Sequence, residues 1–203
     1  MHSFSAMLDT LNAATPERRP TVEQVILDTF QRRKVVLALD MSGFTLTVRR
    51  EGILAYLCQI RRMHLLTKPI VLAHQGAVVK NEADNLLAVF DDAAQAVHAA
   101  LAMMAAAAVV PLGGVTPIAF SIGLDYGEVL LIDQVDCFGD AVNLAYKLGE
   151  DIARPGEVLV TQRVREQLEG HPGGTGGVFQ LQEMSVSVSG LAVAAYTVFP
   201  APR

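Results

Sequence analysis

This sequence has few cysteines, few histidines and little basic charge, and each shortage argues against a class of protein. The 203 residues include two cysteines, Cys58 and Cys137, which fit neither a disulfide framework nor the spacing of a metal site. His64, His74 and His98 are scattered and show no metal-ligand spacing either. The formal net charge is −5 and there is no basic stripe, which argues against a nucleic-acid-binding protein.

A hydrophobic run suited to crossing a membrane is also absent. The nearest candidate, Ala96 to Leu112, is mostly alanine, contains His98 and ends around Pro111. Alanine contributes little free energy of transfer into lipid, so we expect a buried or half-buried helix and no membrane association. No signal peptide is recognisable, and together with the scarcity of cysteine this predicts a cytoplasmic protein.

Apolar residues, in contrast, are plentiful. Hydrophobic residues make up 51% of the chain and charged residues 18%, which is enough for a substantial core and excludes wholesale disorder. Residues 1–34 show two helical patterns separated by a Pro-containing break. We therefore expect an N-terminal helical extension over residues 1–34 and one domain over residues 35–203.

The order of the remaining patterns predicts the fold class. Lys34 to Asp40 is a nearly continuous apolar run, which is typical of a buried central strand. The patterns after it predict, in chain order, a helix over 53–75, strands over 76–80 and 86–90, a helix over 91–109, and strands over 117–124 and 128–132. This order, with closing strands after it, predicts an α+β fold, a ferredoxin-like split βαβ (βαββαβ) arrangement.

Two carboxylates of this predicted fold are candidates for a metal site. Asp40 ends the central strand, and Asp84 lies in the turn between the next two strands; in a split βαβ sheet the first strand lies beside that hairpin. Two neighbouring carboxylates suit Mg²⁺ or Mn²⁺ bound together with a polyphosphate. Between them, Ser42 to Thr45 offers backbone N–H groups at a helix start, which is a seat for phosphate. The alternative is that Asp84 is a simple turn residue and Asp40 a helix cap.

A second cluster of polar residues lies in the stretch from Asp136 to Lys147. Asn143 and Lys147 are four residues apart, so on a helix they share one face, and Gly139 marks a turn or a close approach before it. A loop carboxylate, an amide and a cation directed at one place indicate a ligand site. The alternative is an amphipathic helix with a solvated polar face, whose Lys147 pairs with acidic residues at its own helix end.

Four motifs, taken in order, resemble the catalytic domain of class III nucleotidyl cyclases. They are Leu39 to Thr45 (Asp followed by Gly-Phe-Thr), Lys80 to Asp84 (the Lys-x-x-Gly-Asp hairpin), Ile122 to Val129 (Ile-Gly-x-x-x-Gly-x-Val), and Asp136 to Lys147 (Asp-x-x-Gly-x-x-Val-Asn-x-Ala-x-Arg). The resemblance extends from about residue 35 to residue 199.

The resemblance implies a reaction and a role for each matched residue. Asp40, Asp84 and the backbone carbonyl of Met41 would hold two Mg²⁺ or Mn²⁺ ions per active site, and the three residues that cradle the phosphates would be Gly43, Phe44 and Thr45. ATP would be converted to 3′,5′-cyclic AMP and pyrophosphate, as an adenylate cyclase does in intracellular signalling.

The resemblance also implies a head-to-tail homodimer, because each active site would take residues from both protomers. The partner protomer would supply Lys80 and Asp136 to the base, Asn143 to the ribose, and Lys147 to the reacting phosphate as a catalytic cation. Lys80 can only donate hydrogen bonds and ionised Asp136 can only accept them, which matches the acceptor N1 and the donor amine of adenine. Guanine presents the reverse pattern, whereas cytosine presents the same one, so CTP is an alternative substrate.

Several residues depart from the family pattern. Lys147 stands where the family usually has Arg, Ala83 replaces the hairpin glycine, Glu82 adds a carboxylate, and the connection from Gly127 to Gly139 is short. Arg can grip two phosphate oxygens whereas Lys is a point charge, and Ala would be strained if its backbone needs positive φ. These departures support a second hypothesis, a cyclase-like module that binds nucleotide or a partner with little or no turnover.

Overall fold

The computed structural model describes residues 3–109, 118–132, 135–170, 179–188 and 191–201. The helices are α1 (Phe4–Asn12), α2 (Arg19–Phe30), α3 (Phe44–Glu51), α4 (Ile53–Ala73), α5 (Ala93–Ala108), α6 (Asp140–Tyr146), the π-helical segment η1 (Lys147–Ile152) and α7 (Gln162–Glu169). The strands are β1 (Gln31–Ser42), β2 (Ala77–Glu82), β3 (Asn85–Phe90), β4 (Ala119–Ile132), β5 (Asp136–Phe138), β6 (Val158–Thr161), β7 (Phe179–Val188) and β8 (Leu191–Pro200).

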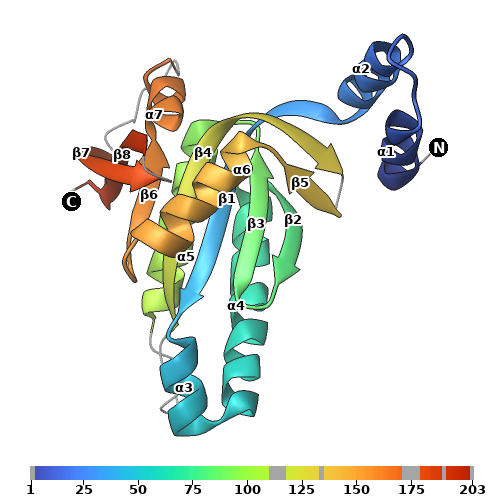
Figure 1. Cartoon of the computed structure of the whole chain (residues 1–203). Helices are drawn as coiled ribbons and strands as arrows, with labels where there is room; N and C mark the ends of the chain where they lie inside the picture. Colours follow the sequence, from blue (N-terminus) through green and yellow to red (C-terminus); the bar gives the residue numbers. More distant parts are fainter. Residues whose placement is uncertain (1–2, 110–117, 133–134, 171–178, 189–190, 202–203) are drawn as a thin grey trace.

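All of these strands form one eight-stranded sheet with β1 near its centre. The order is β2-β3-β1-β4-β6-β8-β7, and β5 pairs with β4 beside this path. Only the pair β4–β6 is parallel among the described strands; the other pairs are antiparallel. The predicted α+β fold with a split βαβ core, closing strands and N-terminal helices is confirmed (Figure 1).

Helices cover both faces of the sheet, which explains why β1 is apolar on both sides. Leu37 and Leu39 pack into a core with α4 and α5, whereas Val36 and Ala38 pack into a second core with α6. Figure 1 shows α6 across one face and α4 and α5 behind the sheet. A strand buried on both faces has no polar alternation, so the continuous apolar run is what the fold requires.

The two strands predicted over 117–124 and 128–132 are wrong as separate elements. The structure has one 14-residue strand, β4, which continues through Gly127. Its partner β1 is 12 residues long and pairs with it from Gln31 opposite Leu130 to Ser42 opposite Ala119. The unbroken ladder of hydrogen bonds, in which Gly127 pairs with Lys34, offsets the weak strand propensity of glycine.

The N-terminal helices α1 and α2 attach beside β5. Phe4 contacts Phe30 edge-to-face with ring centroids 5.0 Å apart, and stacks on Phe138 at 5.9 Å. Helix α2 ends at Phe30, so residues 31–34 already belong to β1. No helix in the described part of the chain is long and apolar enough to cross a membrane.

Candidate functional site

The structure brings the carboxylates of Asp40 and Asp84 together at the end of β1. Asp40 pairs with Asn85 in the β1–β3 ladder, and the Met41 amide donates a hydrogen bond of 3.2 Å to the Asp84 carbonyl. Burial raises the pKa of Asp40, and the negative charge of Asp84 raises it further. The tip of the β2–β3 hairpin is therefore fixed to the strand that carries Asp40, and the two carboxylates interact electrostatically.

The hairpin turn is strained at Ala83. Its φ is +50°, in the left-handed region that favours glycine. Glu82, which the sequence places near the carboxylates, instead lies 3.3 Å from the Lys80 ammonium, and its side chain is 73% exposed.

The turn after β1 presents the start of α3 beside this pair. Gly43 has φ +101° and accepts a hydrogen bond of 3.0 Å from the Thr47 amide, which closes the first helical turn. Phe44 and Thr45 follow it and are exposed. The first N–H groups of a helix lack intrahelical acceptors and carry partial positive charge, so this end can bind an anion.

Lys80 and Asp136 form an ion pair from two different strands. The Lys80 Nζ lies 2.9 Å from Asp136 Oδ1, and each side chain is about a quarter exposed, at 28% and 27%. The hydrogen bond that Lys80 donates to Asp136 raises the pKa of Lys80 despite partial burial, and the one it donates to Glu82 raises it further. The Cys137 amide donates to Asp136 Oδ1 at 2.8 Å, which orients the carboxylate. The pair presents one cationic donor and one anionic acceptor side by side.

Asn143 and Lys147 lie on the exposed side of α6 and η1. Gly139 begins this segment at a close approach, because a Cβ there would lie 2.8 Å from the Glu128 carbonyl. The Lys147 ammonium lies 2.5 Å from Asp151, and this hydrogen bond raises the pKa of Lys147. The helix-end pairing that the sequence offered as an alternative is therefore present. An exposed pair of this kind contributes little free energy and opens readily.

Sequence reasoning missed Glu150. Its Oε1 accepts a hydrogen bond of 2.9 Å from Asn85, the residue next to Asp84. Burial raises the pKa of Glu150, and the charges of Asp40, Asp151 and Asp84 raise it further. The signal was hidden because Glu150 lies in the π-helical turn, where side chains shift from ordinary helical spacing.

Sequence reasoning also missed Tyr56 on α4. Its side chain is 2% exposed, and its hydroxyl donates a hydrogen bond of 2.5 Å to Asp84 Oδ2. The two residues are 28 positions apart, so no local spacing connects them.

The donor chemistry at Asp40 and Asp84 fits Mg²⁺ or Mn²⁺. Both metals prefer carboxylate, carbonyl and water oxygens, and a divalent cation would relieve the repulsion that raises the pKa of Asp40. Within the described residues, no group of three or more His, Cys, Asp and Glu side chains forms a complete metal cage. A pair of carboxylates leaves coordination positions open for phosphate oxygens.

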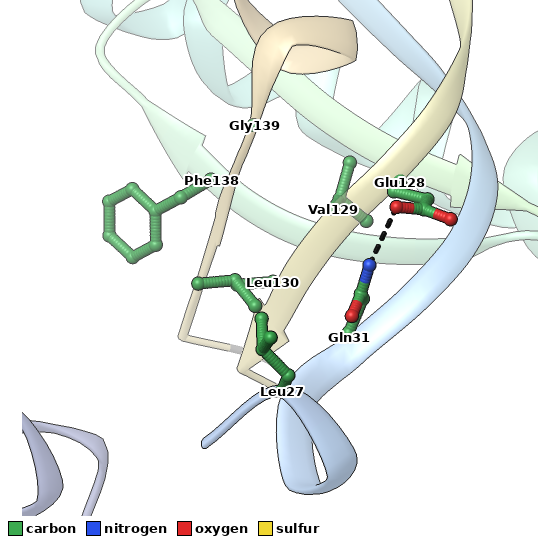
Figure 2. A pocket seen from close by; sticks show the side chains of 7 residues that line it. All are labelled: Leu27, Gln31, Glu128, Val129, Leu130, Phe138 and Gly139. Atoms are coloured by element: carbon green, nitrogen blue, oxygen red, sulfur yellow. Dashed lines mark hydrogen bonds between the residues drawn. The ribbon is translucent and has the colours of Figure 1, made fainter. Parts of the chain in front are cut away.

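A separate cavity of about 330 Å³ lies between the end of α2 and strands β4 and β5 (Figure 2). Its walls are mostly apolar, with Leu27, Val129, Leu130 and Phe138, and its carboxylate, Glu128, accepts a hydrogen bond of 2.6 Å from Gln31. None of the carboxylates of the candidate site lines this cavity.

The comparisons with known proteins agree on one family. The model of the adenylate and guanylate cyclase catalytic domain matches residues 76–198. No curated protein sequence is significantly similar to the chain.

Several solved structures share the fold. An adenylate/guanylate cyclase/hydrolase from Silicibacter pomeroyi is 26% identical with a TM-score of 0.66, covering 85% of this chain and 98% of that one. The guanylate cyclase domain of a Catenaria anguillulae protein, solved in complex with GTP, is 21% identical with a TM-score of 0.72, covering 85% and 99%. An adenylyl cyclase from P. aeruginosa is 20% identical with a TM-score of 0.66, covering 85% and 97%.

Proposed function

This chain belongs to the family of adenylate and guanylate cyclase catalytic domains, and we propose that it converts ATP to 3′,5′-cyclic AMP and pyrophosphate. The observation that carries the proposal is the convergence of Asp40 and Asp84 beside the α3 N-terminus, together with the Lys80–Asp136 pair. In this proposal, the carboxylates and the helix start form the site for metal ions and triphosphate, and the Lys80–Asp136 pair forms the site for the nucleotide base.

In the proposed site, Asp40, Asp84 and the Met41 carbonyl would hold the metals. When bound, two divalent cations would activate the ribose 3′-hydroxyl and neutralise charge on the triphosphate. The backbone N–H groups of Gly43, Phe44 and Thr45 hold the phosphates at the start of α3.

Base selection is assigned to Lys80 and Asp136. The ammonium donates to N1 of adenine, and the carboxylate accepts from the exocyclic amine. Guanine would place its N1–H donor against the Lys80 ammonium and its carbonyl acceptor against the Asp136 carboxylate. Polar groups left unpaired in this way are costly in a binding site. The 2.9 Å pairing of these two side chains supports the proposal, because it holds them at adjacent positions before substrate binds.

Asn143 and Lys147 are assigned to the ribose and to the reacting phosphate. The amide of Asn143 can orient the sugar so that its 3′-oxygen faces the α-phosphate. The Lys147 ammonium must exchange Asp151 for phosphate oxygens as charge develops there. It supplies one positive charge without the planar, bidentate geometry of Arg, so we expect turnover to be slower than Arg at this position would give.

We propose that each site forms between two protomers of a homodimer. Helix α3 and the start of α4, which follow Asp40 in the chain, carry several large exposed apolar side chains: Phe44, Leu46, Ile53, Leu54 and Leu57. Large apolar side chains exposed on two helices that pack against each other suit an interaction surface. Mixing an Asp40→Asn protein with an Asn143→Ala protein should restore cyclisation, because one site of the mixed dimer keeps both intact residues. Two inactive variants that stay inactive when mixed would refute the shared site.

The direct test of the function is cyclic AMP formation from ATP with Mn²⁺. Wild type should form it, and Asp40→Asn should abolish it. Asp91→Asn is the matched control. It also replaces a carboxylate by an amide, but Asp91 lies at the opposite end of the β1–β3 ladder, where it pairs with Lys34. Equal loss in both variants would contradict the assignment of Asp40.

The second candidate function is a nucleotide-binding module with little turnover. The Lys147–Asp151 pair and the strained Ala83 favour it. Under this hypothesis wild type binds ATP without cyclising it, and Lys147→Arg creates or greatly raises activity. Full turnover by wild type would exclude it. The remaining alternative, a CTP-using cyclase, is separated by comparing ATP and CTP as substrates.

A further inference from the structure

Tyr56 links two parts of the proposed site that are far apart in the sequence. It lies in the first turn of the 21-residue helix α4, and its hydroxyl donates to Asp84 Oδ2 at 2.5 Å. Its ring packs edge-to-face against Phe44, with centroids 4.8 Å apart and the planes at 67°. One buried side chain therefore contacts both the hairpin tip and the first residue of α3.

We propose that Tyr56 is a positioning residue that holds Asp84 in its metal-binding orientation and couples that orientation to the phosphate turn through Phe44. The inference rests on the proposed function, because it gives Asp84 a role as metal ligand. Tyr56 itself touches neither metal nor substrate; it acts through Asp84.

The hydrogen bond from Tyr56 occupies only one of the acceptor positions of the Asp84 carboxylate. A carboxylate has two oxygens and about four acceptor positions, so a bond to Oδ2 leaves Oδ1 free for a cation. Metal-binding carboxylates are commonly oriented by such outer partners, and removing one typically weakens metal binding about 10–100-fold. The hairpin tip needs this support because Ala83, with φ +50°, has a left-handed backbone conformation that alanine does not favour.

Burial makes the bond to Asp84 specific. The Tyr56 side chain is 2% exposed, and a buried hydroxyl without an acceptor costs free energy. Asp84 is its partner within the described residues, so the hydroxyl and the carboxylate fix each other. Phe44, half exposed at 50%, then packs on a ring whose position is already set.

The test is the affinity for Mn²⁺, measured by electron paramagnetic resonance of free Mn²⁺ with a non-hydrolysable ATP analogue present. Tyr56→Phe keeps the ring and removes the hydroxyl, and it should weaken Mn²⁺ binding about 10–100-fold. The matched control is Tyr196→Phe, which removes a similar bond of 2.5 Å to Gln162 from a tyrosine that is 4% exposed on β8. The control should bind Mn²⁺ as wild type does, whatever its stability.

A second variant keeps the inference testable if Tyr56→Phe does not fold. Phe44→Leu changes an exposed side chain and should weaken Mn²⁺ binding roughly twofold to tenfold, the effect of losing one edge-to-face ring pair. Wild-type affinity in Tyr56→Phe, or equal weakening in Tyr196→Phe, would overturn the inference.

Failure of the inference is distinguishable from failure of the proposed function. If wild type binds Mn²⁺ and forms cyclic AMP while Tyr56→Phe is unchanged in both, only the role of Tyr56 is wrong. If wild type binds no Mn²⁺, or if Asp84→Asn binds it as wild type does, the metal site itself is wrong and both proposals fall.

Discussion

Replacing Ala83 by glycine should stabilise the protein, which is unusual for a change to glycine. Ala83 is exposed and has φ +50°, so the substitution removes backbone strain without removing a packed side chain. The left-handed conformation costs an alanine roughly 1–2 kcal/mol. Glycine lowers the stability by about 0.4–1 kcal/mol relative to alanine, because it has more conformational freedom in the unfolded chain. We therefore expect a net gain of up to about 1.6 kcal/mol, centred at about 0.8 kcal/mol, in the free energy of unfolding.

The assay is urea unfolding followed by circular dichroism, with Ala77→Gly as the matched control. Ala77 is also exposed and lies in the same hairpin, but it is the first residue of strand β2 and its φ is not positive. Glycine in a strand costs about 0.5–1 kcal/mol relative to alanine, so the two variants should shift in opposite directions. For a chain of this size, 1 kcal/mol corresponds to about 2–4 °C in Tm. If Ala83→Gly destabilises as much as Ala77→Gly, the strain argument is wrong.

Three further predictions follow from buried or interacting charges. Arg163→Gln leaves the carboxylate of Asp125, which is 0% exposed, without its guanidinium partner, and should cost about 3 kcal/mol in urea unfolding. Protonation of Asp125 relieves that cost, so the loss should be smaller at pH 5 than at pH 8; a pH-independent loss would contradict it. Burial, assisted by the charge of His74, lowers the pKa of His98, so the unfolded chain binds the proton more readily and stability should fall as pH drops through the usual histidine range. His98→Gln should reduce that slope between pH 7.5 and 5.5, and an unchanged slope would count against it. Mn²⁺ at about 100 times its Kd should add about 2.7 kcal/mol to the free energy of unfolding, and Asp40→Asn should abolish this gain in a thermal shift assay; an equal gain in the variant would place the metal elsewhere.

Local sequence patterns were sufficient for the parts of the site that lie within single elements. The apolar run ending at Asp40 predicted the central strand, and the turn carrying Asp84 predicted the hairpin beside it. The convergence of the two carboxylates followed from the topology of a split βαβ sheet. The pairing of Lys147 with Asp151 followed from four-residue spacing on a helix.

The parts that could not be predicted depend on tertiary contacts. Tyr56 reaches Asp84 across 28 residues, and a buried tyrosine on a helix has many possible partners in sequence. Glu150 meets Asn85 across 65 residues from a π-helical turn that no residue pattern announces. The tight packing of that turn depends on Gly123, where a Cβ would lie 2.1 Å from a carbonyl of α6, and this close approach is visible only in three dimensions.

Whether this chain cyclises a nucleotide is tested most directly by product identification from ATP, GTP, CTP and UTP, with Mg²⁺ and with Mn²⁺. The wild-type protein should form 3′,5′-cyclic AMP from ATP with one pyrophosphate per product, and little from GTP, because the Lys80–Asp136 pair matches adenine and opposes guanine. Mass spectrometry of the products would establish both the bond formed and the base selected. A wild-type protein that binds nucleotide but yields no cyclic product from any of the four substrates would contradict the proposed function.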